Sequence, residues 1–377
     1  MSGFPGGRAL SGWYEISNPE AVSSPAILLY PARIEQNLQQ MIATAGGVRR
    51  LRSHVKTHKL PQIIALKRQA GISKFKASTI AEAEMTASAG GEDVLLAYQP
   101  VGPNITRLIE LIRRFPQTRF AALVDDADNL ARIGKAAATA GVVIELLVDL
   151  NIGMNRTGIA PGEEAAALYR ALCAMPGLKA AGLHAYDGHL HSSDRQALSK
   201  AVESAFAPVW SLRELLLAES LPVPATIAGG SPTFALLARH DDIELGAGTT
   251  VLSDVHHEQD TPAHAFVPAA VLMARVVSKP QPDLLCLDLG HKAVASEMPL
   301  PRVRLLGLED AQALAHSEEH LVVRSARAAQ YQVGDVVYGV PYHICPTMAL
   351  HSEVWAVLGG RAVELWPVVA RARRISV

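Results

Sequence analysis

Between about residues 50 and 250, short apolar runs alternate with longer segments of helical spacing. The apolar runs, many of them β-branched, predict eight strands at 51–55, 74–78, 93–97, 119–124, 143–150, 179–186, 224–229 and 242–246. The segments between them repeat apolar residues at the helical period, as at 79–91, 105–115, 126–141, 163–175 and 198–220. This alternation indicates βαβ units and a parallel sheet. Eight units in about 200 residues are typical of a TIM (β/α)8 barrel, with a doubly wound open sheet as the alternative.

After about residue 255 the pattern changes. Residues 256–266 are polar and irregular, and short β-like runs split by Gly, Pro and Asp follow, which predicts a mostly antiparallel β domain. Residues 26–46 predict one strand followed by an amphipathic helix. We therefore expect an N-terminal segment (1–30) that joins the β domain, a barrel (31–254) and a C-terminal β domain (255–377).

Composition excludes several classes of protein. The 377 residues are 49% hydrophobic and carry a net charge of -1, so neither a nucleic acid nor a membrane surface is an expected partner. No apolar run is long enough to span a bilayer, and the N-terminal residues lack the order of a signal peptide. The three cysteines are far apart, which fits a reducing compartment. We expect a cytoplasmic protein.

A cluster of basic and titratable side chains follows the first predicted strand, in the stretch RSHVKTHK (52–59). In a barrel, the C-terminal ends of the strands form the active-site rim, and Lys56 would lie there. Neighbouring positive charges favour the neutral, nucleophilic form of a lysine. A solvated basic turn is the alternative interpretation.

Two glycine-rich turns follow the seventh and eighth predicted strands, at GGSPTF (229–234) and GAGTT (246–250). Barrels commonly bind phosphate through backbone N–H groups in these two loops. Glycine-rich turns are ordinary, but both turns together with a rim lysine suggest pyridoxal 5'-phosphate, whose aldehyde forms a Schiff base with a lysine.

Further polar groups follow the fifth and sixth predicted strands. Arg156 could donate to the oxygen of a bound ring, and Tyr186 could contact that ring. The nearby histidines, among them His184 and His189, are candidate general bases. Each of these side chains could instead belong to a solvated polar loop.

His343 and Cys345 are two residues apart, so on an extended strand they would point to the same face. Imidazole and thiolate form a borderline-soft pair that suits zinc. One H-x-C sequence alone is a weak signal of a metal site.

Taken together, these motifs resemble those of the alanine racemase-like, fold-type III pyridoxal-phosphate enzymes. More narrowly, the chain is similar to the family of D-threonine aldolase and eukaryotic-type D-serine dehydratase. The resemblance runs from about residue 25 through RSHVKTHK, GMNRTG, GLHAYDGH, GGSPTF, ELGAGT and YHICPTMALH, in the family's order. It implies a barrel followed by a β domain, and a homodimer.

The resemblance also implies roles for particular residues. Lys56 matches the Schiff-base lysine, Arg156 the arginine at the cofactor's phenolic oxygen, and Tyr186 a tyrosine beside the ring. The phosphate-binding positions match Gly230, Ser231, Gly248 and Thr249. The divalent-metal ligands, for Zn or Mn, match His343 and Cys345. Cysteine rather than aspartate at 345 looks more like the dehydratases and favours zinc, whereas the stretches 278–297 and 346–353 look more like the aldolases.

The resemblance implies a pyridoxal-phosphate- and metal-dependent lyase acting on β-hydroxy-D-amino acids. Retro-aldol cleavage to glycine and an aldehyde is the first hypothesis, for which His189 is the preferred general base and His58 or His184 are the substitutes. The alternative is a D-serine or 3-hydroxy-D-aspartate dehydratase. An amino-acid racemase is a third possibility, although racemisation needs no metal. A cofactor-carrying protein without turnover is a fourth, and the added β domain and H-x-C pair argue against it.

Overall fold

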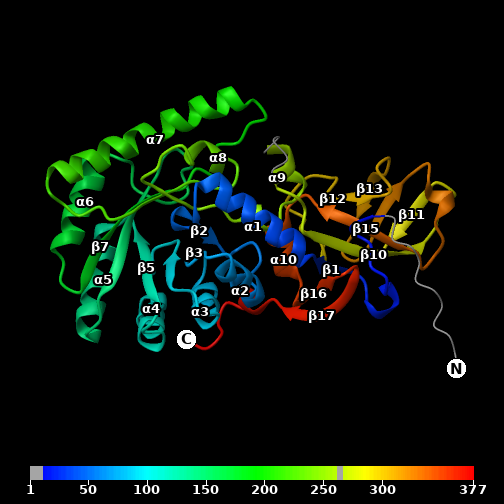
Figure 1. Cartoon of the computed structure of the whole chain (residues 1–377), viewed down its shortest axis with the longest axis horizontal. Coiled ribbons are helices and arrows are strands. Elements are labelled where there is room, and N and C mark those ends of the chain that lie inside the picture. The colour runs from blue at the N-terminus through cyan, green and yellow to red at the C-terminus, as the bar shows by residue number, and fades with distance from the viewer. Residues whose placement is uncertain (1–11, 261–265) are drawn as a thin grey trace. The chain divides into compact units, whose positions relative to one another are not determined.

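The computed structural model describes residues 12–260 and 266–377. These fall into two compact units, each with its own sheet. One unit consists chiefly of Leu38–Thr250 and is joined by the last residues, Val369–Val377. The other contains the first strand of the chain, Val251–Gln259 and the strands that follow. Figure 1 shows the elements of both units.

The first unit is a barrel of eight parallel strands in sequential order, as predicted. Its strands are β2 (Arg52–His54), β3 (Lys74–Ala77), β4 (Asp93–Leu96), β5 (Arg119–Val124), β6 (Ile144–Leu150), β7 (Leu178–Ala185), β8 (Thr226–Ala228) and β9 (Glu244–Leu245). A parallel bridge between Leu51 and Leu245 joins the first and last strands. The open-sheet alternative is therefore excluded.

Helices follow the barrel strands and lie outside them (Figure 1). They are α2 (Pro61–Gln69), α3 (Ile80–Ser88), α4 (Pro103–Arg114), α5 (Ala127–Ala140), α6 (Glu163–Ala174), α7 (Arg195–Ala218) and the short α8 (Phe234–Leu237). Local sequence starts several of them: the side chains of Thr79, Asp126 and Asp194 accept hydrogen bonds from the first turns of α3, α5 and α7. Gly141 ends α5 in the left-handed conformation.

The barrel interior is filled by apolar side chains from alternate positions of the strands. The cluster consists of Leu95, Ala121, Leu123, Leu147, Ala181 and Ile227. The last two strands are shorter than predicted, because glycines take over where pairing would continue. Gly229, for example, leaves β8 with a φ of +80°.

The second unit is a mostly antiparallel sheet, as predicted, together with α-helices. Its elements are β1 (Ala26–Leu29), α1 (Pro31–Ala45, which runs into the first unit), α9 (Val255–Asp260), β10 (Ala270–Ser278), β11 (Leu284–Leu287), β12 (Val303–Leu306), β13 (Gln312–His316), β14 (Leu321–Arg324), β15 (Val336–Pro341), α10 (Ile344–Leu350), β16 (Glu353–Leu358) and β17 (Arg361–Pro367). Strand β1 pairs antiparallel with β10 and parallel with β16. The domain limits at 30 and 254 stay predictions.

Two local predictions in this unit were wrong. Residues 256–266 were expected to be irregular, yet Val255–Asp260 is helix α9, and residues 261–265 lie outside the described part. His343 and Cys345 would share a face on an extended strand, but His343 is the N-cap of helix α10 and Cys345 lies within it. In both cases one carboxylate provides the start signal, because Asp254 accepts from the backbone N–H of His257 and of Ile344. No described helix is long and apolar enough to cross a membrane.

Candidate active site

Lys56 lies in the turn that follows β2, at the C-terminal end of the barrel. The turn is closed by backbone hydrogen bonds from His58 and Lys59 to the carbonyl of Val55. Lys59 has a φ of 55°, which lets the chain reverse into α2. The backbone N–H of Lys56 donates to His54 Nδ1 at 3.2 Å. The lysine is therefore held at the strand end, with its side chain partly exposed.

A second lysine, on the helix that follows, supports this turn from the protein interior. Lys67 of α2 is fully buried, and its Nζ lies 2.9 Å from His58 Nε2 and 3.3 Å from the carbonyl oxygen of His54. His58 Nδ1 also accepts from the backbone N–H of Leu60. Burial lowers the pKa of Lys67 to about 7. Because both nitrogens of His58 are engaged inside the protein, this histidine is a structural support of the turn.

Arg156 lies in the loop after β6, whose shape is set by Asn151. The Asn151 side-chain oxygen accepts from the backbone N–H groups of Gly153 and Asn155, both at 3.1 Å. Gly158 closes the loop with a φ of +97°, and a Cβ there would lie 2.6 Å from the Asn151 backbone nitrogen. Glycine at 158 is thus needed for the return of the chain.

Tyr186, in the loop after β7, is surrounded by cations. Its ring centroid lies 5.6 Å from Lys56 Nζ, 5.4 Å from Lys76 Nζ and 4.8 Å from Arg156 Cζ. A Cβ on Gly188 would come within 2.4 Å of this ring, and one on Gly230 within 3.1 Å. Three predicted residues, Lys56, Arg156 and Tyr186, are therefore brought together.

A buried hydrogen-bonded pair lies beside them. His184 Nδ1 is 2.6 Å from Asp149 Oδ1, and Thr157 donates to Asp149 Oδ2 at 2.8 Å. Burial alone would raise the pKa of Asp149, but His184 and Thr157 hold it below its usual range. The pKa of His184 is lowered by burial and by the charge of Lys76. Its Nε2 has no hydrogen-bond partner among the described residues.

The turns after β8 and β9 meet each other. Backbone N–H groups of Gly248 and Thr249 both donate to Ser231 Oγ, at 3.3 and 3.1 Å. A Cβ on Gly248 would come within 2.7 Å of His54 Cβ, so this turn requires glycine. Three of the four predicted phosphate-binding positions, Ser231, Gly248 and Thr249, thus lie together, with both backbone N–H groups directed at the Ser231 hydroxyl.

The site encloses a cavity of about 310 Å³. Its lining includes His54, Lys56, Lys76, Arg156, His184 and Tyr186. His189, the predicted base, does not line this cavity. Its Nε2 lies 2.9 Å from the position that a Cβ on Gly153 would take. Its role as a base therefore stays a prediction. His184, near the end of β7, does line the cavity.

His343 and Cys345 meet at the start of α10 in the other unit. Burial would lower the pKa of His343, but its hydrogen bonds with Cys345 and Glu297 raise it to about 9. The contact between His343 Nδ1 and Glu297 Oε1 is 2.6 Å. Thr347 Oγ1 donates to the His343 carbonyl and accepts from the backbone N–H of Ala295, which anchors the turn. Helical spacing at the cap, rather than strand alternation, brings the pair together.

The donor chemistry of this pair suits a divalent metal of borderline softness. Across residues 12–260 and 266–377, no group of three or more His, Cys, Asp or Glu side chains is arranged to hold a metal ion. Two protein ligands would leave the other coordination positions to substrate and water.

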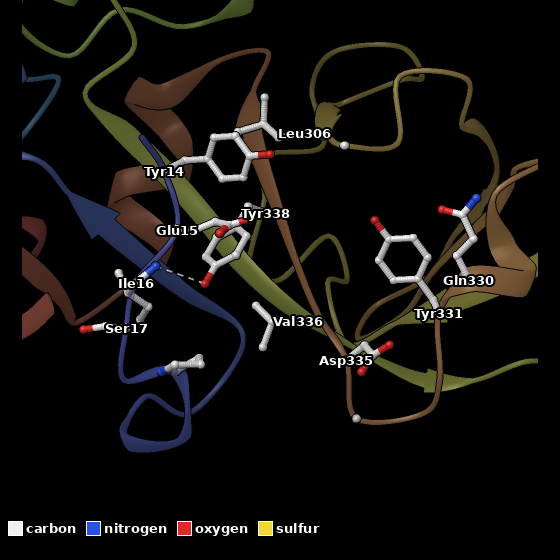
Figure 2. A pocket seen from close by; sticks show the side chains of 13 residues that line it. Tyr14, Glu15, Ile16, Ser17, Leu306, Gln330, Tyr331, Asp335, Val336 and Tyr338 are labelled. Atoms are coloured by element: carbon white, nitrogen blue, oxygen red, sulfur yellow. Dashed lines mark hydrogen bonds between the residues drawn. The ribbon is translucent and has the colours of Figure 1, made fainter. Parts of the chain in front are cut away.

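The second unit also contains a cavity of about 560 Å³ (Figure 2). It is lined by aromatic and polar groups that include Tyr14, Tyr331, Asp335 and Tyr338. Tyr338 OH accepts a hydrogen bond from the backbone N–H of Ile16 at 3.4 Å. None of the predicted site residues lines this cavity, so we assign no chemistry to it.

Sequence reasoning did not single out Lys76, His54 or Asp149, although all three are buried in the barrel. The available signal was a charged or polar residue inside a predicted strand, because such a residue requires a partner or a function when its side chain points inward. The apolar neighbours of Lys76 in β3 obscured this signal.

Two family models match the chain. One, described as the N-terminal domain of alanine racemase, covers residues 30–253. The chain belongs to this family. The second, a putative serine dehydratase domain, matches residues 269–357, in the β domain.

Relatives of known activity match over nearly the whole chain. D-threonine aldolase of Arthrobacter sp. is 31% identical over 93% of both chains. D-threo-3-hydroxyaspartate dehydratase of Delftia sp. (strain HT23) is 25% identical over 92% of this chain and 97% of its own. The crystal structure of D-threonine aldolase from Filomicrobium marinum has a TM-score of 0.86 and 29% identity over 93% of this chain and 96% of that one. The family resemblance seen in the motifs is confirmed.

Proposed function

We propose that the chain is a pyridoxal 5'-phosphate- and divalent-metal-dependent lyase that cleaves β-hydroxy-D-amino acids to glycine and an aldehyde. The observation that carries this proposal is the position of Lys56. It lies at the barrel mouth in one cavity with Arg156 and Tyr186. The similarity to D-threonine aldolases over 93% of the chain supports the choice of reaction.

The residues of the cavity fit the cofactor. The volume of about 310 Å³ lies at the lower end of the usual range for ligand sites, in keeping with a small ligand. The converging N–H groups of Gly248 and Thr249 suit a phosphate, with Gly230 and Ser231 completing the cradle. Lys56, Lys76 and Arg156 supply positive charge for an anionic ligand. When bound, the cofactor would supply an electron sink for the bond that breaks at the substrate's α-carbon.

Side chains of the protein would hold the cofactor, orient its ring and move protons. Lys56 Nζ would hold the cofactor covalently and, once released by the substrate amine, is the amine available to move protons. Arg156 would orient the ring through its phenolic oxygen, and Tyr186 would pack beside it. A base must take the proton of the β-hydroxyl, and His189 keeps this role as a prediction. His184 is the substitute, because its free Nε2 belongs to a histidine that lines the cavity.

His343 and Cys345 would bind the divalent metal. A metal held there would supply Lewis acidity toward the substrate's β-hydroxyl. The Asp254 carboxylate, which anchors both α9 and α10, would keep the two ligands in position.

The test of the reaction is a product assay on purified enzyme with D-threonine and 3-hydroxy-D-aspartate. Formation of glycine in equal amount to an aldehyde would support the aldolase. Formation of ammonia with a keto acid, without glycine, would replace it by the dehydratase.

The dehydratase is the second candidate because of Cys345. Cysteine beside His343 is a softer donor set than histidine with aspartate, and the β domain matches the serine dehydratase model. Both candidates require the metal. Cys345→Ala should therefore remove most activity with the cofactor still bound, whereas Cys173→Ala, at a half-buried cysteine of α6, should have little effect. Full turnover after exhaustive chelation would rule out a catalytic metal.

Two further expectations concern the place where the enzyme works and its oligomeric state. We propose that the enzyme works in the cytoplasm on small D-amino acids and that it forms a homodimer. Size-exclusion chromatography with light scattering would measure the oligomeric state, and a monomer that is fully active would contradict the second expectation.

A further inference from the structure

Segment 293–297, which precedes β12, is hydrogen-bonded to helix α10, whose first turn contains the proposed metal ligands. At the C-terminal end of the helix, His351 Nε2 donates to the backbone carbonyl of Ala293 at 2.8 Å. One turn earlier, Thr347 Oγ1 accepts from the backbone N–H of Ala295 at 3.1 Å. These contacts form a ladder in which a step of two residues on the segment matches a step of four residues on the helix.

The next step of this ladder joins two side chains, those of Glu297 and His343. His343 Nδ1 lies 2.6 Å from Glu297 Oε1. Thr347 supports both sides of this contact, because its fully buried side chain also donates to the His343 carbonyl at 2.8 Å. The hydrogen bonds of the ladder therefore bring the carboxylate to the imidazole, so the contact does not depend on two flexible side chains meeting at the surface.

This contact determines which nitrogen of His343 is available to a metal. An ionised carboxylate only accepts hydrogen bonds, so the proton of the contact is on Nδ1. The nitrogen left for a metal is then Nε2. Proteins commonly hold a metal-ligating histidine in this way, by a carboxylate that accepts from the ring nitrogen which the metal does not use. Such a carboxylate also makes the imidazole a more basic ligand.

We propose that Glu297 is a positioning residue of the metal site, which fixes the His343 ring so that Nε2 and Cys345 Sγ bind the divalent metal together. This inference rests on the proposed function, because the metal at His343 and Cys345 is part of that proposal. Glu297 is not arranged as a third ligand, since the described residues contain no group of three or more His, Cys, Asp or Glu side chains positioned to hold a metal ion.

A plain surface ion pair is the competing explanation of the contact. The side chains of His343 and Glu297 are 41% and 45% exposed, and ion pairs at such positions contribute little to stability. The urea midpoint of the metal-free protein should therefore be the same in wild type and Glu297→Ala under either explanation. Only the positioning role predicts that this substitution changes the affinity for the metal.

The test is the affinity of the cofactor-loaded enzyme for Zn²⁺, measured by competition with a chelating indicator. Glu297→Ala should weaken zinc binding about 10- to 100-fold, the usual effect of losing a group that orients a metal ligand. Glu297→Gln keeps an oxygen that can accept from Nδ1, so it should recover most of this loss. Glu318→Ala is the matched control. It removes the same charge from another ion pair of this unit, with Lys292 at 2.7 Å, and should leave zinc affinity unchanged.

A second readout does not depend on any substitution at position 297. The ¹⁵N resonances of the His343 imidazole in zinc-loaded enzyme, assigned by their absence in His343→Gln, should show a protonated Nδ1 and a zinc-bound Nε2. The reverse assignment would overturn the inference. Equal zinc affinity in Glu297→Ala and Glu318→Ala would reduce the contact to a surface ion pair. A loss in Glu297→Gln as large as that in Glu297→Ala would also contradict the inference, because the hydrogen bond would not explain it.

Failure of the proposed function would look different. If His343→Gln and Cys345→Ala both bind zinc as tightly as wild type, the proposed metal site itself is wrong. If both variants lose zinc while Glu297→Ala keeps it, only the role of Glu297 is wrong.

Discussion

The two ends of the barrel differ in whether their charged side chains form ion pairs. At the N-terminal end, each strand-start cation has a carboxylate partner. Arg52 lies 2.6 Å from both Asp93 and Glu244, and Arg119 joins Asp93, at 2.7 Å, to Glu145 on the next strand. Lys74 pairs with Glu244 and Lys179 with Glu145, so these ion pairs form a belt around the strand starts. Although burial raises the pKa of Asp93, its arginine partners outweigh this and hold it below the usual range.

At the C-terminal end, the cations that line the cavity have no such partners, although Lys59 in the turn after β2 pairs with Glu82. Lys56, Lys76 and Arg156 line one cavity, and none of them makes an ion pair within the described chain. The carboxylates there are engaged by neutral or weakly basic groups: Asp149 by His184 and Thr157, and Asp187 by Thr233. The same fold thus pairs its charges at the end that provides stability and leaves cations unpaired in the cavity where we propose that it binds an anionic ligand.

Lys56→Ala should have the largest effect on chemistry. Without the amine the cofactor loses its covalent anchor, so the visible absorbance of the bound cofactor should disappear and activity should fall about a thousandfold or more. Thermal unfolding of the cofactor-free protein should change little, because Lys56 is partly exposed and forms no ion pair. Persistence of the visible band would place the covalent attachment elsewhere.

Arg52→Met should have the largest effect on stability. Removing this buried guanidinium takes from Asp93 and Glu244 their most buried cation partner and leaves them only Arg119 and Lys74, at an expected cost of about 3 kcal/mol in the free energy of unfolding. Urea denaturation of the cofactor-free protein measures this. The visible spectrum of folded, reconstituted enzyme should match wild type; a changed spectrum would mean that the two ends are coupled.

Lys76→Met should stabilise the cofactor-free protein, which is the opposite of the effect at the other end. Burial lowers the pKa of Lys76 to about 7, so between this value and the unfolded value of about 10.4 the unfolded chain binds more protons. The cost of burying the lysine is complete below pH 7 and disappears as pH rises through this window. We expect a gain on the order of a few kcal/mol at neutral pH that vanishes in alkali. A destabilised variant at pH 7 would contradict it.

Lys179→Met should have the smallest effect. Its Nζ is 2.9 Å from Glu145, but its side chain is 61% exposed, and Arg119 still pairs with the same carboxylate. The expected loss is below about 1 kcal/mol, and it should shrink as salt is added. A loss as large as that of Arg52→Met would show that the belt acts as one network.

Much of the fold was predictable because the sequence of a barrel repeats one strand–helix pattern eight times. The strand at 119–124 has the predicted bounds, since β-branched and apolar residues there are flanked by clear helix signals. The catalytic rim followed from chain order, because each strand of a parallel barrel delivers its next loop to the same end. Lys56, Arg156, Tyr186 and the glycine turns could be located this way.

The wrong predictions have a common cause. The stretch around His343 and Cys345 has the short, mixed pattern of a strand, but Asp254, distant in sequence, accepts from Ile344 and helps to start a helix. The turns after β8 and β9 likewise shorten their strands to meet each other through Ser231. Hydrogen bonds between distant segments override local propensity in such places.

The sequence by itself determined the repeating units, the order of the motifs and the end of the barrel at which they gather. Only the tertiary structure decided which polar residues meet inside that end: the pairing of His184 with Asp149, and the Lys76 amine in the space left by Gly246. The reason is physical. Periodicity along a strand says that alternate side chains share a face, but closure of the barrel decides which face points inward and which distant group it meets.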